Sequence, residues 1–291
     1  MLYVAIFAPL ASAITVHYYS LMKTIPLFQV DAFTGDVFSG NPAAVCPLDE
    51  WLDDTTLQSI AAENNLAETA FFVPVKGRET DRADYHLRWF TPKLEVKLCG
   101  HATLASAFVV FTELDRESRS VRFDSQSGVL TVERDGDRLS MDFPAWKPKP
   151  VAIVPEALLK GLGRTPSEVL VVEPDRNYYA VFESESDVRA IRPDFERLSE
   201  LHPHGVVVTA PGDSSDCASR YFVPSWGVPE DPVTGSIHCG LVPYWAARLD
   251  SPRIHARQVS ERGGDLFCED RGDRVSISGR AVRYLEGSIH F

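Results

Sequence analysis

The sequence lacks the features that mark several classes of protein. It has no run or stripe of lysine and arginine, and 41 acidic residues outnumber 29 basic ones, which gives a net charge of −12 at pH 7. Nucleic acid, which binds to clustered positive charge, is therefore not expected as a partner. The five cysteines are widely spaced and form no CxxC motif. Their odd number and spacing argue against a disulfide framework and favour a reducing, cytoplasmic location.

A metal site is not expected either. Cysteine and histidine occur close together at two places, but neither pair has the spacing of a structural zinc site. These pairs are Cys99 with His101 and His238 with Cys239.

One hydrophobic run opens the chain, MLYVAIFAPLASAITV. It is short for a membrane span and lacks the basic start of a secretory signal, although 11–13 (Ala-Ser-Ala) is similar to a cleavage site. Met22 is followed by KTIPLFQVDAF, which has the pattern of an opening strand. We therefore expect residues 1–21 to be an extension outside the fold, with a weak signal peptide as the alternative, and no membrane partner.

The remaining chain predicts an α+β fold with a duplicated order of elements. Its 291 residues, 44% of them hydrophobic, suffice for one large domain or two of about 130 residues. Strands, one buried helix and further strands occur on each side of the proline-rich segment 144–155. This order predicts two similar halves, 22–145 and 146–280, each a sheet around a central helix. The final strand, 281–291, could pair with strands of the first half instead of the second.

Several helices can be predicted from local patterns. Residues 54–64 have helical spacing, with Asp53 or Asp54 as the cap. The segment 100–114 is apolar on nearly all sides and therefore predicts a buried helix. A helical stretch is expected near 192–201, and another apolar helix is expected directly after Ser236.

Two polar turns precede the two apolar helices. Gly100 and His101 open the turn 100–103, and Gly235 and Ser236 belong to the turn 234–236. The first N–H groups of a helix lack internal partners and attract anions, so both turns could bind a substrate carboxylate. Ordinary helix capping is the alternative for either turn taken alone.

Four side chains near these turns are candidates for chemistry. Glu68 lies in a largely apolar strand, where burial would raise its pKa toward that of a general acid/base, unless the residue is solvated at a frayed strand end. His101 could donate a hydrogen bond or move a proton, or serve only the structure. Asp231 could bind an amine or cap the helix. Cys99 could be a reactive thiol or a small buried residue.

From about Ile25 to the C-terminus the sequence resembles the PhzF-like family, named for the phenazine-biosynthesis isomerase. The resemblance rests on separate motifs in the same order: VDAFTGDVFSGNPAAV, ENNLAETAFF, LRWFTPKLEVKLCGHATLASA, SRYFVPSWGVPEDPVTGSIHC and RGGDLF. It implies the diaminopimelate epimerase fold, with two pseudo-symmetric halves, each a barrel-like sheet around a central helix, and an active site in the cleft between them. It also implies no metal or organic cofactor, and a homodimer, because the family is often dimeric.

The resemblance also implies roles for individual residues. The glutamate of NLAETAF, which carries the proton, corresponds to Glu68, and the histidine of the GH motif corresponds to His101. The aspartate of EDPVTGS corresponds to Asp231 and the asparagine of GNP to Asn41, a substrate contact or a residue behind one. The Gly-Ser of the same turn corresponds to Gly235 and Ser236.

Some residues depart from the phenazine enzymes. Ala67 stands where those enzymes have serine, and CGHAT replaces their GHP motif, so the chemistry of Glu68 transfers better than the substrate does. Epimerases of this fold use two facing cysteines. Cys99 matches the first, but Cys239 lies about a helical turn too far along, which disfavours a two-cysteine racemase.

We therefore expect a cofactor-independent isomerase that moves a hydrogen within a small amino or cyclic acid, with Glu68 as acid/base. Asn41, Gly100, His101, Asp231, Gly235 and Ser236 are expected to bind this carboxylate substrate. Two alternatives stay open: a non-catalytic binding protein on the same fold, and a one-cysteine racemase that uses Cys99.

Overall fold

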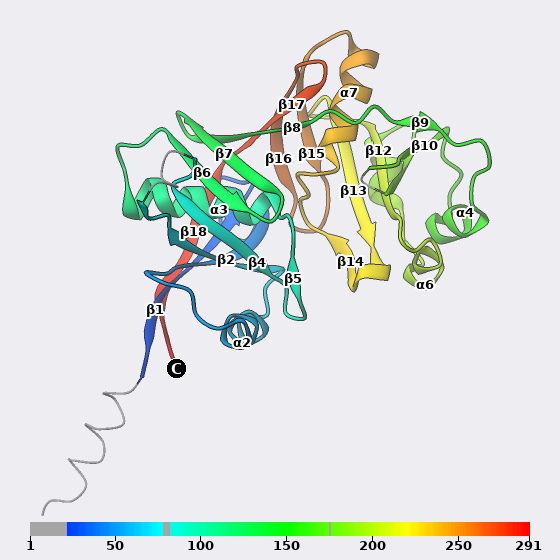
Figure 1. Ribbon diagram of the computed structural model, residues 1–291. Coiled ribbons are helices and arrows are strands. Elements are labelled where there is room, and N and C mark those ends of the chain that lie inside the picture. The colour runs from blue at the N-terminus through cyan, green and yellow to red at the C-terminus, as the bar shows by residue number, and fades with distance from the viewer. Residues whose placement is uncertain (1–21, 78–81, 175) are drawn as a thin grey trace, which may run out of the picture.

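The computed structural model describes residues 22–77, 82–174 and 176–291, and it has a mixed α/β fold rich in strands (Figure 1). The expectations for residues 1–21 lie outside the described residues. Within the described part, no helix is long and apolar enough to cross a membrane.

The first half of the chain, before the proline-rich segment, contains eight strands and two α-helices among the described residues. Its strands are β1 (Thr24–Ala32), β2 (Asn41–Pro47), β3 (Glu68–Pro74), β4 (Tyr85–Phe90), β5 (Glu95–Val96), β6 (Ser120–Ser125), β7 (Gly128–Asp135) and β8 (Arg138–Pro144). Its helices are α2 (Asp54–Asn64) and α3 (Gly100–Val109), which continues as the π-helical segment η2 (Val110–Leu114).

The second half begins after the proline-rich segment. Its strands are β9 (Lys149–Pro150), β10 (Glu168–Val172), β11 (Asn177–Val181), β12 (Gly205–Pro211), β13 (Cys217–Val223), β14 (Val228–Asp231), β15 (Arg253–Gln258), β16 (Gly264–Asp270), β17 (Arg274–Gly279) and β18 (Ala281–His290). Its helices are α4 (Glu156–Leu162), α5 (Glu185–Ala190), α6 (Phe195–Ser199), the 3₁₀ turn η3 (Pro224–Trp226) and α7 (His238–Leu249).

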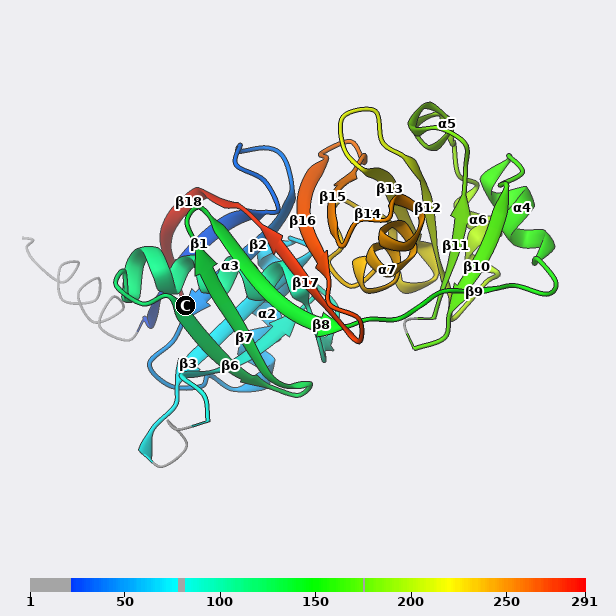
Figure 2. The same cartoon turned by 90° about the horizontal axis from the view of Figure 1, so that it is seen from above.

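The strands form two series that meet at one pair. The first runs β18-β1-β2-β3-β4-β6-β7-β8, and the second runs β9-β10-β11-β12-β13-β15-β16-β17. In both, the pairings are antiparallel, antiparallel, parallel, antiparallel, parallel, antiparallel and antiparallel. β8 and β17 pair with each other, so the two series lie side by side as one continuous sheet (Figure 2).

Helix α3 lies against the first series because its sequence has almost no polar face. It contacts β1, β2, β3, β7, β8 and β18, and all of its residues except Gly100 and Phe108 are buried. The hydroxyls of Thr103 and Ser106 donate back to helix carbonyls, which satisfies these two buried groups. The expected buried helix over 100–114 is therefore present, with its last turn widened into η2. Helix α7 packs on β15, β16 and β17.

Local signals account for some helix ends. The side chain of Asp53 accepts a hydrogen bond from the N–H of Thr56, so Asp53 caps α2 as expected. The helix expected near 192–201 is wrong in extent. Only α6 lies in that range, because Pro193 disfavours helix at the preceding residue and Asp194 caps a helix that begins at Phe195. The helix α5 ends before the range, at Ala190.

Candidate active site

Four element ends meet at the candidate active site. Glu68 is the first residue of β3, Asn41 is the first of β2, His101 lies in the first turn of α3, and Asp231 is the last residue of β14. Residues 70 and 72, which share the strand face of Glu68, belong to the core around α3. The alternation of β3 therefore directs the Glu68 side chain toward the start of this helix.

Glu68 and His101 form a buried contact. Oε2 of Glu68 lies 3.1 Å from Nε2 of His101, and the side chains are 18% and 7% exposed. The two atoms are poorly aligned for a hydrogen bond, and neither has another partner among the described residues. On the other edge of the imidazole, Nδ1 lies 3.5 Å from Sγ of Cys99. The pair thus keeps hydrogen-bonding capacity for a ligand.

Asn41 connects this pair to the second half of the chain. Its buried side-chain amide donates to Oδ1 of Asp231 at 2.8 Å and to the carbonyl of Val233 at 2.9 Å. The same nitrogen lies 3.3 Å from Nδ1 of His101. Its Oδ1 is buried and has no partner among the described residues. Asn41 therefore lies between Asp231 and His101, and its Oδ1 can accept a hydrogen bond from a ligand.

The loop before Asn41 is held by the second half as well. Arg262 donates to the carbonyls of Ser39 and Gly40 and forms an ion pair with buried Asp31 at 2.9 Å. Gly40 has φ +66°, and a Cβ there would lie 2.2 Å from the carbonyl oxygen of Ala32. Only glycine fits this position, which sets the direction in which β2 begins.

Sequence reasoning missed the residue that fixes the Asp231 turn. Gln258, the fully buried last residue of β15, donates to the carbonyl of Asp231 at 2.7 Å and accepts from the N–H of Thr234 at 2.8 Å. The Thr234 hydroxyl donates a short hydrogen bond to Oδ2 of Asp231. No local sequence signal could have linked Gln258 to a turn 24 to 27 residues away.

The charge of Glu68 differs from the expectation. Burial is the largest influence and raises its pKa, but the charge of His101 and the polar contacts with His101 and Cys99 together outweigh it. The pKa of Glu68 is therefore lowered, and the predicted rise is wrong. The prediction considered the strand neighbours of Glu68 and left out the cation beside it.

The partners of Glu68 are shifted in the opposite sense. Although burial disfavours the charged imidazole, neighbouring Cys99 and Glu68 raise the pKa of His101 well above its ordinary value. Burial raises the pKa of Cys99, and the charge of Glu68 adds to that rise. Burial also raises the pKa of Asp231 to about 6, against the opposing influence of His101. At neutral pH the site thus holds an ionised Glu68, a charged His101 and a protonated Cys99.

The two turns expected to bind a carboxylate differ in detail. Gly100 is the first residue of α3, as expected, but α7 begins at His238, two residues beyond Ser236. Gly235 and Ser236 form a separate turn, because their carbonyls accept the N–H groups of residues 238 and 239. Within the described residues, the N–H groups of Gly235, Ser236 and Ile237 have no acceptor.

His238 and Cys239, at the start of α7, have other partners than Glu68. Nδ1 of His238 lies 2.8 Å from the carbonyl of Thr234, and burial lowers its pKa to about 4, so it is neutral at pH 7. Cys239 lies near Cys268. This position agrees with the argument against a two-cysteine racemase.

Three residues of the site have the donor atoms of a cation site. The ligand atoms of Glu68, Cys99 and His101 all lie within 4.8 Å of one another. However, His101 directs Nε2 to Glu68 and Nδ1 toward Cys99. One ion cannot take both nitrogens of a single ring, so binding to all three residues would require the ring or a neighbour to move.

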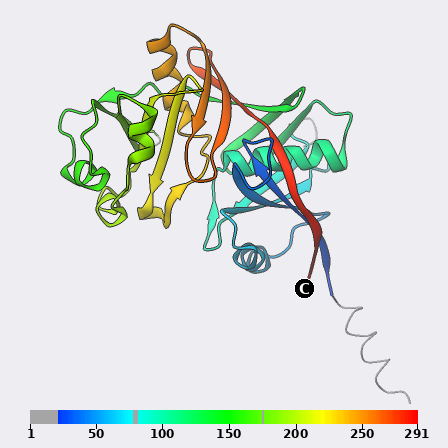
Figure 3. The ribbon, with the colours of Figure 1, turned by 180° about the vertical axis from the view of Figure 1, so that it is seen from behind.

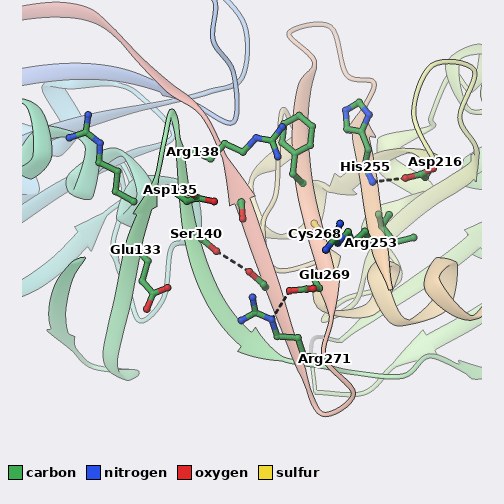
Figure 4. A pocket seen from close by; sticks show the side chains of 15 residues that line it. Glu133, Asp135, Arg138, Ser140, Asp216, Arg253, His255, Cys268, Glu269 and Arg271 are labelled. Carbon is green, nitrogen blue, oxygen red and sulfur yellow. Dashed lines mark hydrogen bonds and ion pairs between the residues drawn. The ribbon is translucent and has the colours of Figure 1, made fainter. Parts of the chain in front are cut away.

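A separate cavity of about 660 Å³ lies between β7 and β8 on one side and β15, β16 and β17 on the other (Figure 4). Arg138 stacks 3.5 Å above the ring of Phe267, whose other neighbour is the parallel ring of His255 at 4.8 Å. Both acidic and basic side chains line it, and Glu68, His101, Asn41 and Asp231 do not. The cavity is therefore distinct from the candidate active site.

Known proteins resemble this chain over almost its whole described length. A model of the PhzC-PhzF family, described as phenazine biosynthesis-like protein, matches residues 30–287. An uncharacterized isomerase of Pseudomonas aeruginosa is 53% identical over 266 residues, which are 91% of this chain and 99% of that protein. The crystal structure of a PhzF-family protein from Enterococcus faecalis has a TM-score of 0.86 at 43% identity, covering 92% of this chain and 100% of that chain.

A more distant structure shares the fold. It is named a predicted epimerase of Pseudomonas aeruginosa, with a TM-score of 0.68 at 19% identity, over 91% of this chain and 99% of that chain. The resemblance drawn from the sequence motifs is confirmed by the family model and by these relatives. The chain belongs to the phenazine biosynthesis-like (PhzC-PhzF) family.

Proposed function

We propose that this chain is a cofactor-independent isomerase that moves a hydrogen within a small carboxylate-bearing amino or cyclic acid, with Glu68 as the acid/base. The observation that carries the proposal is the Glu68–His101 contact, whose facing atoms are buried, 3.1 Å apart and not fully used. The relatives named isomerases support the enzyme class. The substrate class rests on the chemistry of the site.

The charges favour Glu68 as a base. With a lowered pKa, Glu68 is ionised at neutral pH and can accept the proton of a substrate C–H bond. The two electrons of that bond stay on the substrate and spread toward its carboxyl-bearing end. Glu68, now a carboxylic acid, returns the proton to a different carbon, which leaves the enzyme unchanged. The step consumes no oxidant or reductant, so it needs no co-reactant.

Neighbouring groups suit a substrate with both a cationic or hydroxyl group and a carboxylate. Asp231 and Oδ1 of Asn41 offer acceptors to an amine or hydroxyl. The N–H groups of Gly235 and Ser236 offer donors to a carboxylate, and so does the start of α3 at Gly100. Fixed donors of this kind stabilise negative charge as it develops.

The proposed fold has two pseudo-symmetric halves with the substrate site between them. The identical order of parallel and antiparallel pairings in the two strand series supports two pseudo-symmetric halves, each with a central helix, α3 or α7. The hydrogen bonds of Asn41 to Asp231 and Val233 support a substrate cleft between the halves. Five free, buried cysteines support a cytoplasmic location.

The one-cysteine racemase is less favoured. Cys99 is buried, and its raised pKa keeps it as a thiol at neutral pH, whereas a thiolate is the reactive form. The non-catalytic alternative has no specific observation in its favour.

Hydrogen exchange with solvent tests the role of Glu68. Wild-type protein in deuterated water is mixed with a panel of amino and cyclic acids, and loss of each C–H signal is followed by NMR. In Glu68→Gln the exchange rate should fall by roughly 10²-fold or more, while ligand affinity measured by calorimetry should persist. Glu63→Gln, on the exposed face of α2, is the matched control.

The outcomes separate the alternatives. Equal exchange by wild type and Glu68→Gln would remove Glu68 from the mechanism. Loss of exchange on alkylation of Cys99, with Glu68→Gln unaffected, would favour the racemase. Binding without exchange across the whole panel would favour a binding protein.

A further inference from the structure

Three ligand atoms of different chemistry converge beside the Glu68–His101 contact. A carboxylate oxygen of Glu68, the sulfur of Cys99 and an imidazole nitrogen of His101 all lie within 4.8 Å of one another, and no other such group of three occurs among the described residues. Oε2 of Glu68 and Nε2 of His101 are buried and lack a hydrogen-bond partner in the part of the chain that the structure describes. A bound cation would satisfy these buried atoms.

The three side chains are held by packed elements. Cys99 directly precedes α3 and His101 lies in its first turn, and this helix contacts β1, β2 and β18 (the blue-green helix beside the blue and red strands in Figure 3). Glu68 begins β3, which contacts the same helix. Ligands that are already held in place lose little conformational freedom when an ion binds, so less binding free energy is spent on ordering them.

The spacing of sulfur and nitrogen suits a tetrahedral ion. Sγ of Cys99 lies 3.5 Å from Nδ1 of His101, and an ion about 2.3 Å from the sulfur and about 2.1 Å from the nitrogen would span this distance with an angle of about 105°. Asn41 does not occupy the lone pair of Nδ1. Both hydrogens of its amide already go to Asp231 and to the carbonyl of Val233, at 2.8 and 2.9 Å.

We propose that Glu68, Cys99 and His101 bind one thiophilic divalent cation such as zinc, and that this ion reversibly blocks the proposed acid/base. Sulfur, nitrogen and oxygen together suit zinc or cobalt, whereas magnesium and calcium prefer oxygen ligands alone. The neighbour that has to move is Glu68, whose carboxylate turns from Nε2 toward the ion. This carboxylate already contacts Cys99 as well as His101, so a change in side-chain torsions is enough. Solvent takes the fourth position.

The exchange of protons for the ion is balanced in charge. Binding removes one proton from the Cys99 thiol and one from the charged imidazole of His101, because the thiolate and the neutral imidazole are the ligand forms. Two protons leave as one doubly charged ion enters, so the net charge buried at the site is unchanged. The ion then holds the lone pair with which Glu68 would accept a substrate proton. This inhibitory role rests on the proposed function, but the binding of the ion does not.

Cobalt tests the ligand set without an assay of activity. Full-length, metal-free wild type should bind one Co²⁺ and show a thiolate-to-cobalt charge-transfer band in the near ultraviolet, and zinc should displace the cobalt. Cys99→Ser should lose this band and bind zinc at least about tenfold more weakly, since even a lost outer-shell partner costs about 10–100-fold. Cys239→Ser is the matched control and should keep both properties, because Cys239 also stands beside a histidine at a helix start but lies outside the group.

A measurement on wild type alone guards against a variant that fails to fold. X-ray absorption of the protein with one bound zinc should show one sulfur ligand. The surface pairs His86–Asp124 and His255–Asp265, at 3.2 and 2.8 Å, are competing sites that contain no sulfur. Zinc with only nitrogen and oxygen ligands, the absence of the cobalt band in wild type, or a band that survives in folded Cys99→Ser would each overturn the proposal.

Hydrogen exchange separates this proposal from the proposed function. One equivalent of zinc should lower wild-type exchange at least about tenfold, since a positioned acid/base contributes roughly 10²-fold or more, and a chelator should restore it. A cobalt band together with zinc-insensitive exchange would overturn the inhibitory role. A cobalt band in a protein that exchanges no hydrogen in any acid of the panel would support the ion site and contradict the proposed function, and with it the inhibitory role.

Discussion

Replacement of Asp231 by asparagine should make the protein more stable and less active. Asp231 carries a charge in surroundings that disfavour it, since burial raises its pKa from 3.8 to about 6. A shift of about two units corresponds to about 3 kcal/mol between the folded and unfolded states. Because the side chain is only part-buried, solvent screening reduces this figure to about 2 kcal/mol. Asparagine keeps the shape and removes the charge.

The sign of the effect depends on pH. Asp231 is an acid whose folded pKa lies above its unfolded value, so between pH 4 and 6 the folded state binds more protons than the unfolded state. Its contribution to stability therefore falls as pH rises through that window. At pH 8 Asp231→Asn should have a higher free energy of unfolding by about 1 kcal/mol, after about 1 kcal/mol is allowed for imperfect hydrogen bonds from Asn41 and Thr234. At pH 4, where Asp231 is protonated in the folded wild type and only that hydrogen-bond cost remains, the variant should be less stable by about 1 kcal/mol.

Denaturant unfolding at pH 4, 6 and 8 measures this difference. Asp273→Asn, in the exposed turn between β16 and β17, is the control and should show no such trend. The exchange activity of Asp231→Asn should fall at every pH, because the variant loses the acceptor for a substrate amine. If wild type and Asp231→Asn differ by the same free energy at all three pH values, the charge of Asp231 is not disfavoured by the fold.

Two further substitutions test how the site is held in place. Gln258→Met should cost about 2–4 kcal/mol in unfolding free energy and weaken exchange activity, since it leaves two part-buried backbone groups of the turn 231–234 without the Gln258 partner. An unfolding free energy within 0.5 kcal/mol of wild type would contradict this. Gly40→Ala should lower the melting temperature more than Gly128→Ala, because both positions have positive φ but only position 40 would set a Cβ against the Ala32 carbonyl; equal losses on heating would refute the steric argument.

Local chemistry determined which parts of the fold could be predicted. The cap at Asp53 and the buried α3 follow from signals contained in a few adjacent residues. Pro193 and the capping side chain of Asp194 are also local signals, and they set the start of α6 at Phe195. The duplicated order of elements was recognisable because strand and helix patterns repeat around a proline-rich segment. The pairing of β8 with β17 has no comparable local signal.

The sequence motifs contain residues that the structure brings together, but they do not give the direction of the Glu68 pKa shift. Glu68, His101 and Asp231 stand in recognisable motifs, and the structure brings them together through Asn41. The direction of the Glu68 pKa depends on a contact with a residue 33 positions away, which the strand pattern does not contain. Gln258 acts through two backbone groups and carries no motif of its own, so only the three-dimensional arrangement identifies it.

The distribution of unsatisfied polar atoms identifies the part of the molecule that is kept ready for a ligand. Elsewhere in the core, buried hydroxyls such as those of Thr103 and Ser106 bond to nearby carbonyls, as stability requires. Among the described residues, three of the seven buried side-chain atoms without a hydrogen-bond partner belong to Asn41, Glu68 and His101. His101 contacts both of the other residues, so these atoms lie at one site, where the Glu68–His101 contact offsets part of the desolvation cost and a polar ligand can offset the rest. A disfavoured charge on neighbouring Asp231 adds to the same cost, which is the reason that a stabilising substitution at this position should also reduce activity.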